Sequence, residues 1–298
     1  MPTRLLNMEL KKGFYPALGT PLDEKGNLVA ESFSKQIEMM IDAGAAGVLC
    51  MGSMGTESAL TSDTYRNTAY VAVETVKGRV PVFIGAMDNS VYRVKERFEM
   101  IKDLDCSGIV LTTPFYETSS NESLIEFFKE CADAAPKPVF LYDLAVITKQ
   151  KITFEMAEEL SAHPNIKGIK TGDIVLARKL MLANPDLHVM FSNIDIFDVA
   201  GAFGLPKVLD GMFTCTPKNS KEFVKYFEAG DTKKAGVYLD KILALRDLMA
   251  ENGIWPGYTI AMNLLGLMGS YGGGYGVDKP YDGEYEQIKL FMEKIGEI

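Results

Sequence analysis

The chain has 298 residues, which suits one large domain, because a (β/α)₈ barrel typically needs about 250 residues. Hydrophobic residues make up 47% of the chain and charged residues 24%, an ordinary globular balance that leaves little room for disorder. The formal net charge of −9, with no cluster of basic residues, argues against a nucleic-acid partner.

The N-terminal segment, residues 1–12, lacks the apolar core of a signal peptide, and no apolar run reaches the roughly 18 residues of a membrane span. We therefore expect a cytoplasmic protein with no membrane partner. The four cysteines are scattered and only two histidines are present, so we expect neither a disulfide framework nor a multi-histidine metal site.

Short apolar runs, which we interpret as strands, alternate with amphipathic runs of helical period along most of the chain. The predicted strands cover residues 15–19, 47–51, 80–85, 108–112, 139–142, 166–170, 188–192 and 208–213. The predicted helices cover residues 31–43, 62–76, 90–104, 121–134, 153–162, 174–183, 194–203 and 220–229. This alternation implies parallel β-α-β units and an α/β fold. We prefer a TIM barrel to an open doubly wound sheet, because the count is eight and no Gly-x-Gly-x-x-Gly follows the first strand.

Three more helical patterns follow the eighth unit, at residues 231–250, 258–267 and 284–294. No linker-like composition separates them from the rest of the chain. We therefore expect residues 1–230 to form the barrel and residues 231–298 to form a C-terminal helical extension packed on it. The glycines at 272–274 indicate a flexible loop rather than a phosphate cradle, since no Gly-Lys-Ser/Thr follows them.

The sixth predicted strand ends on Lys170, which shares one face of the strand with Ile166 and Gly168. In a TIM barrel the C-terminal ends of the strands form the active site. A lysine buried there is costly to keep charged, so its pKa should fall, and a neutral amine can attack a ketone to form a Schiff base. The alternative is a solvated lysine at a strand terminus, because lysine side chains are usually exposed.

Hydroxyl side chains lie at or just after the ends of three other predicted strands. They are Tyr142, Tyr116 and Ser53, and Ser53 belongs to the glycine-containing run 52–55. Tyrosine hydroxyls linked through a serine can move the protons that Schiff-base formation requires. Backbone N–H groups around Gly52 and Gly55 can bind a carboxylate, because glycine lets the backbone approach closely. Tyr142 could equally be a core tyrosine and the glycine run a tight turn. This chemistry needs no metal and no organic cofactor.

Four blocks, in this order, resemble the dihydrodipicolinate synthase / N-acetylneuraminate lyase family of class I, pyruvate-handling lyases. They are the opening turn Gly19-Thr20-Pro21 to Gly26-Asn27, the loop Gly52-Ser53-Met54-Gly55, the block Thr113-Pro114-Phe115-Tyr116, and Leu141-Tyr142 followed by Gly168-Ile169-Lys170. The spacing of the last pair is the family's own. The resemblance runs from about residue 13 to the C-terminus.

The resemblance implies a role for each matching residue. Lys170 would form the Schiff base, Tyr142 would be the acid/base beside it, and Ser53 and Tyr116 would complete the proton relay. Tyr116 would reach into a neighbouring subunit's site, so the family implies a homo-oligomer, a dimer or a tetramer. The backbone of Ser53 and Met54 would hold the substrate carboxylate.

The sequence departs from the family where the second substrate binds. Met54 replaces a hydroxyl residue, and Thr56 stands where a glutamate is expected. Ile147 stands where dihydrodipicolinate synthases have an arginine, and isoleucine cannot pair with a carboxylate. Asp195, in the same predicted loop as Asn193, either accepts hydrogen bonds from a polyol or caps the next helix. We favour the helix cap.

With Phe213 at the end of the last predicted strand, the expected substrate-binding residues are Gly52, Met54, Gly55, Thr56, Ile147, Asn193, Asp195 and Phe213. We expect a class I aldolase or lyase that acts on pyruvate or a related 2-oxo acid through a lysine Schiff base, with a sugar-acid-derived aldehyde as its partner. The alternatives are a 2-oxo-3-deoxy sugar acid dehydratase using the same lysine, a dihydrodipicolinate synthase with an altered aldehyde site, and a non-catalytic 2-oxo acid-binding protein.

Overall fold

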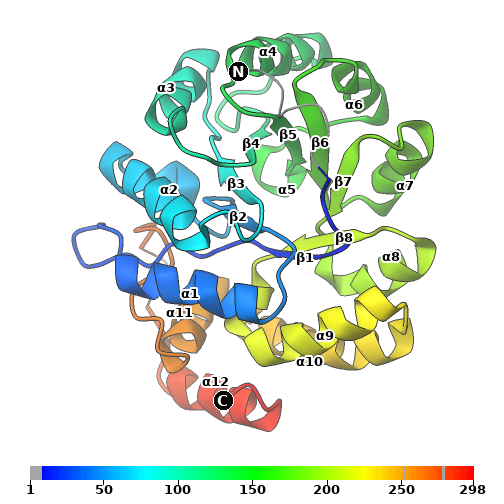
Figure 1. The fold of residues 1–298 in the computed structure, drawn as a ribbon. Coiled ribbons are helices and arrows are strands. Elements are labelled where there is room, and N and C mark those ends of the chain that lie inside the picture. The colour runs from blue at the N-terminus through cyan, green and yellow to red at the C-terminus, as the bar shows by residue number, and fades with distance from the viewer. Residues whose placement is uncertain (1–8, 252, 277–278) are drawn as a thin grey trace.

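A computed structural model describes residues 9–251, 253–276 and 279–298 of the chain. Its eight strands pair in parallel in the order β1-β8-β7-β6-β5-β4-β3-β2, and a parallel bridge between Ala17 and Leu49 links the two ends into a nearly closed barrel. The strands are β1 (Gly13–Pro16), β2 (Val48–Cys50), β3 (Val82–Gly85), β4 (Gly108–Thr112), β5 (Val139–Asp143), β6 (Ile166–Thr171), β7 (His188–Phe191) and β8 (Lys207–Asp210). The predicted TIM barrel is therefore confirmed (Figure 1).

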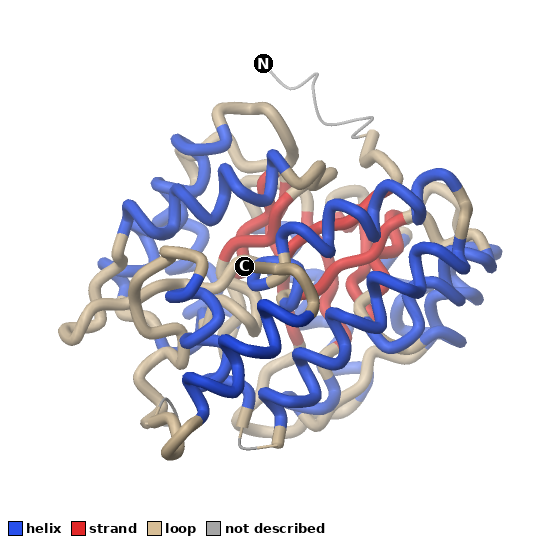
Figure 2. Tube along the Cα trace, turned by 90° about the horizontal axis from the view of Figure 1, so that it is seen from below, coloured by secondary structure: helices blue, strands red, loops and turns tan. Residues whose placement is uncertain are grey.

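Helices surround the strands on the outside of the barrel, as the red strands and blue helices of Figure 2 show. These helices are α1 (Ala30–Asp42), α2 (Ser62–Val76), α3 (Val91–Ile101), α4 (Asn121–Ala134), α5 (Ala145–Thr148), α6 (Phe154–Ser161), α7 (Ile174–Ala183), α8 (Phe197–Phe203) and α9 (Pro217–Ala229). Side-chain caps start several of them: the hydroxyls of Thr61, Ser120 and Thr153 each accept a hydrogen bond from the first turn.

Two layers of apolar side chains form the core. An outer layer lies between strands and helices, and an inner layer, which includes Tyr15, Phe83 and Phe140, fills the barrel. The Phe83 and Phe140 rings meet edge to face at 4.9 Å. A Cβ on Gly168 would lie 2.4 Å from the Phe140 ring, so only glycine lets this ring pack there, two residues before Lys170 on the same inward face.

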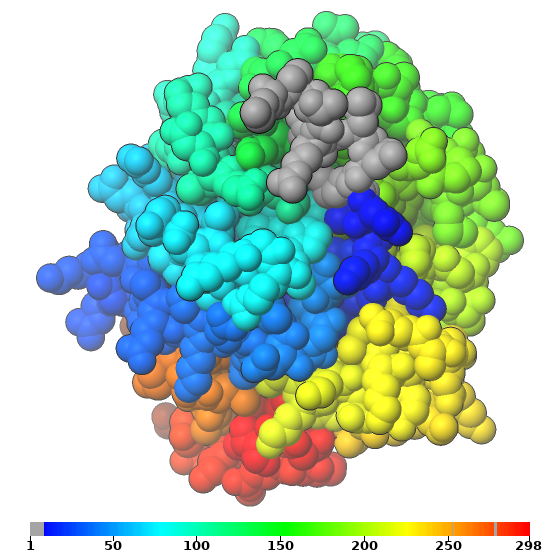
Figure 3. Space-filling view, in the orientation of Figure 1, coloured from blue at the N-terminus to red at the C-terminus, as the bar shows by residue number. Residues whose placement is uncertain are grey.

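The C-terminal region consists of α10 (Thr232–Ala250), α11 (Ile254–Leu264) and α12 (Glu284–Lys294). In Figure 3 the orange and red surface of α11 and α12 lies against that of α1 (blue) and of α9 and α10 (yellow). The Glu297 carboxylate accepts hydrogen bonds from the backbone N–H groups of Lys218 and Asn219 at the start of α9, at 2.6 and 3.1 Å. This contact ties the end of the chain to a barrel helix. No helix in the described ranges is long and apolar enough to cross a membrane.

The last strand is the main difference from the predicted elements. It was expected to run to residue 213 but ends at Asp210, and Met212–Cys215 forms a 3₁₀ turn. The Asp210 carboxylate accepts a hydrogen bond from the Met212 N–H at 2.8 Å, which turns the chain out of the sheet. The helix predicted at 194–203 is divided into a 3₁₀ turn, Ile194–Ile196, and α8, and the short helix α5 was not predicted.

Candidate active site

Lys170 and Tyr142 lie side by side at the C-terminal mouth of the barrel. They are register partners on the adjacent strands β6 and β5, so both side chains point to the same face. Lys170 is only 5% exposed, and its Nζ atom lies 3.6 Å from the centre of the Tyr142 ring. No carboxylate among the described residues forms an ion pair with this amine. The structure therefore places a buried amine against the tyrosine expected to serve it.

Ser53 reaches Tyr142 from the loop that follows β2. Its Oγ atom lies 3.1 Å from the Tyr142 hydroxyl, so the two groups share a hydrogen bond. The loop is tightly built: a Cβ on Gly55 would lie 2.8 Å from the Cα of Met51, and the Thr20 hydroxyl donates to the Gly55 carbonyl at 2.7 Å. Gly55 is thus required by the fold of the loop, whatever else its N–H group does.

The other residues of this loop are held by packing. A Cβ on Gly52 would lie 2.9 Å from the Leu49 side chain, and the Met54 side chain fills the space beside Gly211. Thr56 is buried with a left-handed backbone (φ 50°), and its hydroxyl has no hydrogen-bond partner among the described residues.

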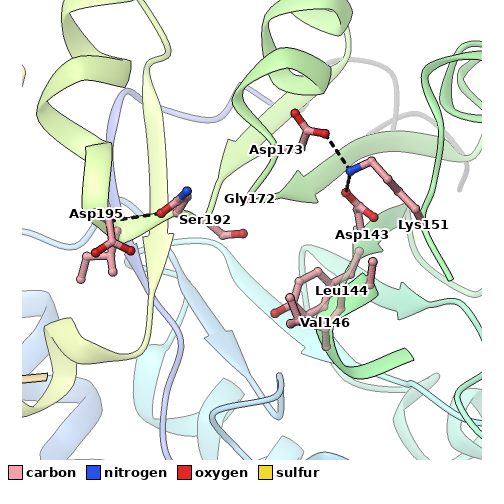
Figure 4. Close-up of a pocket in the computed structure, with 12 residues that line it drawn as sticks. Asp143, Leu144, Val146, Lys151, Gly172, Asp173, Ser192 and Asp195 are labelled. Atoms are coloured by element: carbon pink, nitrogen blue, oxygen red, sulfur yellow. Dashed lines mark hydrogen bonds and ion pairs between the residues drawn. The ribbon is translucent and has the colours of Figure 1, made fainter. Parts of the chain in front are cut away.

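A polar hollow of about 400 Å³, which we call the acidic hollow, opens where β5, β6 and β7 end (Figure 4). Its polar lining includes Asp143, Asp173, Asp195, Lys151 and Ser192. The Lys151 Nζ atom lies 2.7 Å from Asp173 and 3.3 Å from Asp143, and this hydrogen-bonded ammonium holds the pKa of Asp173 below its ordinary value. Three carboxylates with one shared lysine favour a ligand rich in hydroxyl groups.

The 3₁₀ turn after β7 settles how Asn193 and Asp195 behave. Asn193 is the capping residue, because its side-chain oxygen accepts a hydrogen bond from the Asp195 N–H at 3.3 Å. The Asp195 carboxylate instead pairs with Arg246 of α10 at 2.7 Å. The helix-capping reading of Asp195 is therefore wrong. Asp195 lines the acidic hollow with its charge partly neutralised by the C-terminal region.

A second hollow of about 250 Å³, which we call the relay cavity, lies on the other side of Leu144. Ser53 lines it, together with Glu57, Thr112, Ile147 and the ring of Trp255 from α11. Ile147, the residue in the place of the family's arginine, thus gives this cavity an apolar wall. Thr56 lines it as well.

Two predicted site residues do not reach this region with their side chains. Tyr116 is 84% exposed, on a segment whose backbone N–H groups at Phe115 and Tyr116 donate to the Asn89 side chain at 2.8 and 2.9 Å. Phe213 is fully buried outside the barrel, where its ring packs 4.9 Å from that of Phe14. Because β8 ends early, the Phe213 ring turns into the outer core.

Four charged residues near the mouth were missed by the sequence analysis: Glu57, Lys151, Asp210 and Arg246. Burial raises the pKa of the Asp210 carboxyl, and the Met212 N–H and the charge of Lys170 oppose that rise. The position of Asp210 at the end of the last strand was the available signal, hidden because the strand was predicted to continue.

A TIM barrel with a buried lysine and a hydrogen-bonded tyrosine at its C-terminal mouth is the arrangement of a Schiff-base lyase. The model of the dihydrodipicolinate synthetase family matches residues 10–272, and the chain belongs to that family. Dihydrodipicolinate synthases and N-acetylneuraminate lyases are lyases that act through a lysine Schiff base, and the chain is an enzyme of this class.

The comparisons with individual proteins agree. The chain is 26% identical over 266 residues to a 4-hydroxy-tetrahydrodipicolinate synthase of Gluconacetobacter diazotrophicus, covering 87% of this chain and 88% of that one. Its fold matches YagE of E. coli K12, a prophage protein of the dihydrodipicolinic acid synthase family in complex with pyruvate, with TM-score 0.88, 23% identity and coverage of 97% and 100%. It also matches Proteus mirabilis N-acetylneuraminate lyase, with TM-score 0.87, 17% identity and the same coverage.

Proposed function

We propose that the enzyme joins pyruvate, or a related 2-oxo acid, to an aldehyde, or cleaves the product, through a Schiff base on Lys170. The observation that carries this proposal is the contact of the Lys170 amine with Tyr142 at 3.6 Å, while the Tyr142 hydroxyl is hydrogen-bonded to Ser53. A nucleophile, an acid/base and a second hydroxyl are thus within reach of one carbonyl group.

The steps follow from these positions. The Lys170 amine attacks C2 of the 2-oxo acid, and the carbinolamine loses water while Tyr142 and Ser53 move the protons. Loss of a C3 proton gives an enamine, which attacks the aldehyde carbon in synthesis. In the reverse direction, carbon–carbon cleavage frees the aldehyde and leaves the same enamine on Lys170. The backbone N–H groups of Ser53 and Met54 hold the carboxylate. No metal or organic cofactor is required.

The aldehyde partner is proposed to be derived from a sugar acid, because the acidic hollow beside Tyr142 offers Asp143, Asp173 and Asp195 to hydroxyl groups. The named relatives favour instead a dihydrodipicolinate synthase with an altered aldehyde site. Ile147 speaks against that alternative, since it offers no hydrogen-bond donor to the second carboxylate. A 2-oxo-3-deoxy sugar acid dehydratase would use the same lysine, and only the aldolase would release pyruvate.

We also propose that the enzyme is a homo-oligomer in which the exposed Tyr116 contacts a second copy. Its 84% exposure leaves the ring available for such a contact. Sedimentation analysis of wild-type protein and of the Tyr116→Ala variant tests it, and a wild-type monomer would contradict it.

The experiment that tests the chemistry is borohydride reduction in the presence of pyruvate, followed by mass spectrometry of the peptides. A reduced pyruvyl adduct is expected on Lys170, with none in a sample without pyruvate. A longer 2-oxo acid follows under the same conditions if pyruvate gives none. Failure with both would overturn the Schiff-base proposal and favour a binding-only protein.

A further inference from the structure

The Ser53–Tyr142 pair needs a group that holds the protons it moves. A serine hydroxyl and a tyrosine hydroxyl pass a proton on, but neither keeps it near neutral pH. Ser53 faces the relay cavity, whose volume of about 250 Å³ equals about eight water molecules of the liquid. A proton that leaves Ser53 on this side therefore enters a space large enough for hydrogen-bonded solvent.

Residues whose buried side-chain oxygens make no hydrogen bond to the described residues line that space. The hydroxyls of Thr56 and Thr112 and both carboxyl oxygens of Glu57 are buried and make no hydrogen bond to the described residues. Buried polar groups are almost always hydrogen-bonded, so four such atoms on one cavity indicate bound solvent or ligand within it. Ser53 and Glu57 both line this cavity, so it adjoins both residues.

Glu57 is the one titratable group among these atoms, and it is 1% exposed. The charged groups around it are Arg97 and Arg93 of α3 and Asp88, which follows β3. The Arg97 Nε atom lies 3.4 Å from Glu57 and 3.7 Å from Asp88, while Arg93 lies 2.7 Å from Asp88. Because Asp88 also faces Arg97, the guanidinium keeps an anionic neighbour whether Glu57 is ionised or neutral.

Burial raises the pKa of the Glu57 carboxyl to about 8, and Asp88 adds to the rise while Arg97 and Arg93 oppose it. A carboxyl that titrates there is populated in both forms near neutral pH, as an efficient acid/base requires. It can therefore both take up and return a proton during turnover.

We propose that Glu57 exchanges protons with the Ser53–Tyr142 pair through the relay cavity and so holds the proton removed from the bound 2-oxo acid. This rests on the proposed function. In the enamine step the C3–H bond breaks, its electrons form the C2=C3 bond, and the iminium nitrogen becomes neutral. The proton passes to Tyr142, then to Ser53, and through the cavity to the Glu57 carboxylate. Glu57 acts through these groups and does not touch the substrate, so it is a positioning residue and not a catalytic one.

The test is exchange of the pyruvate methyl protons for deuterium in D₂O, followed by proton NMR, because this reaction needs no aldehyde. Glu57→Gln keeps the shape of the side chain but cannot ionise. We expect the exchange rate of wild type to rise between about pD 7 and 9. In Glu57→Gln we expect exchange to be about tenfold slower or more and this rise to be lost. Glu57→Asp is expected to restore part of both, and Glu122→Gln, on the surface of α4, is the matched control that changes neither.

Borohydride trapping on the same samples separates the possible failures. An adduct on Lys170 in Glu57→Gln, with slow exchange, supports the inference. An adduct in Glu57→Gln, together with wild-type exchange and a wild-type pH profile, overturns it. Slow exchange in Tyr116→Phe but not in Glu57→Gln also overturns it, because that result would place the end of the relay on a second copy. Wild-type protein that forms no adduct with either pyruvate or the longer 2-oxo acid overturns the proposed function and this inference with it. Circular dichroism establishes that each variant is folded, and Glu57→Asp carries the test if the glutamine variant is not.

Discussion

The acidic hollow and the relay cavity share Leu144 in their linings, and both contain carboxyl groups. The two surroundings shift the pKa values of Asp173 and Glu57 in opposite directions. In the acidic hollow Lys151 touches Asp173 and Asp143, and its hydrogen bond holds the pKa of Asp173 down. In the relay cavity Glu57 also has a cation nearby, yet burial outweighs it and raises the pKa to about 8.

The difference shows that burial outweighs the neighbouring cation at Glu57, whereas the hydrogen-bonded ammonium outweighs burial at the partly exposed Asp173. Lys151 is 47% exposed on its side chain, so its ammonium stays hydrated while it pairs with both aspartates. Arg97 is buried beside Glu57 and shared with Asp88. The acidic hollow is therefore suited to binding, and the relay cavity is suited to holding a proton.

Removal of the Lys170 amine should abolish the Schiff-base chemistry to which both hollows contribute. We expect Lys170→Ala to abolish methyl-proton exchange of pyruvate and turnover with any aldehyde, because Lys170 supplies the buried amine that lies against Tyr142. Lys167→Ala is the matched control, since Lys167 lies on the same strand but on its opposite face. Undiminished activity in Lys170→Ala would end this mechanism.

Loss of the Tyr142 hydroxyl should uncouple Lys170 from Ser53. We expect Tyr142→Phe to slow exchange and turnover by about 10²–10⁴-fold, the usual scale for a lost general acid or base, while the ring still packs against the amine. Exchange rates by NMR measure the loss, and Tyr92→Phe on the exposed surface of α3 is the control. A change under twofold would move the acid/base role to another group.

The β5–β6 side of the mouth was predictable from the sequence for a physical reason. Strand alternation fixes which residues share a face, so Lys170 and Tyr142 follow directly once the two strands are recognised. The barrel itself followed from eight alternations of strand and helix.

The rest of the mouth depended on contacts between distant segments. The pairing of Glu57 requires Arg97, which comes from α3, and the pairing of Asp195 requires Arg246, which comes from α10. The early end of β8 depends on one side-chain hydrogen bond, from the Met212 N–H to Asp210. Periodicity carries no signal for any of these contacts.

Ile147→Arg should place a cation in the relay cavity. We expect the rate ratio of succinic semialdehyde to butanal, as partners of pyruvate, to rise roughly ten- to hundredfold, because a hydrogen bond to a charged group contributes about 1.5–3 kcal/mol. The ratio is measured by pyruvate consumption with each aldehyde. Val237→Arg, on the exposed surface of α10, is the control, and an equal rise there would show that the relay cavity does not select the aldehyde.

The effect on stability should be weak, and its pH dependence should have opposite signs in the two hollows. Glu57 binds its proton more tightly in the folded state than in the unfolded chain, where a glutamate titrates near about 4.3. Its contribution is therefore full below that pH and is lost as pH rises to about 8. The pKa of Asp173 is lowered on folding, so its contribution is present above the ordinary pKa of aspartate and is lost as pH falls.

Urea unfolding across pH 3–9 measures both contributions. The deficit of each variant is the amount by which its free energy of unfolding falls below that of wild type. The deficit of Glu57→Gln should shrink as pH rises from about 5 to 8, and that of Asp173→Asn should shrink as pH falls below about 4. Asp173 is partly exposed, so its effect is the weaker of the two. If the deficit of Glu57→Gln grew with pH instead, Glu57 would be an ionised partner of Arg97, and the two hollows would not differ in the way their carboxyl groups are held.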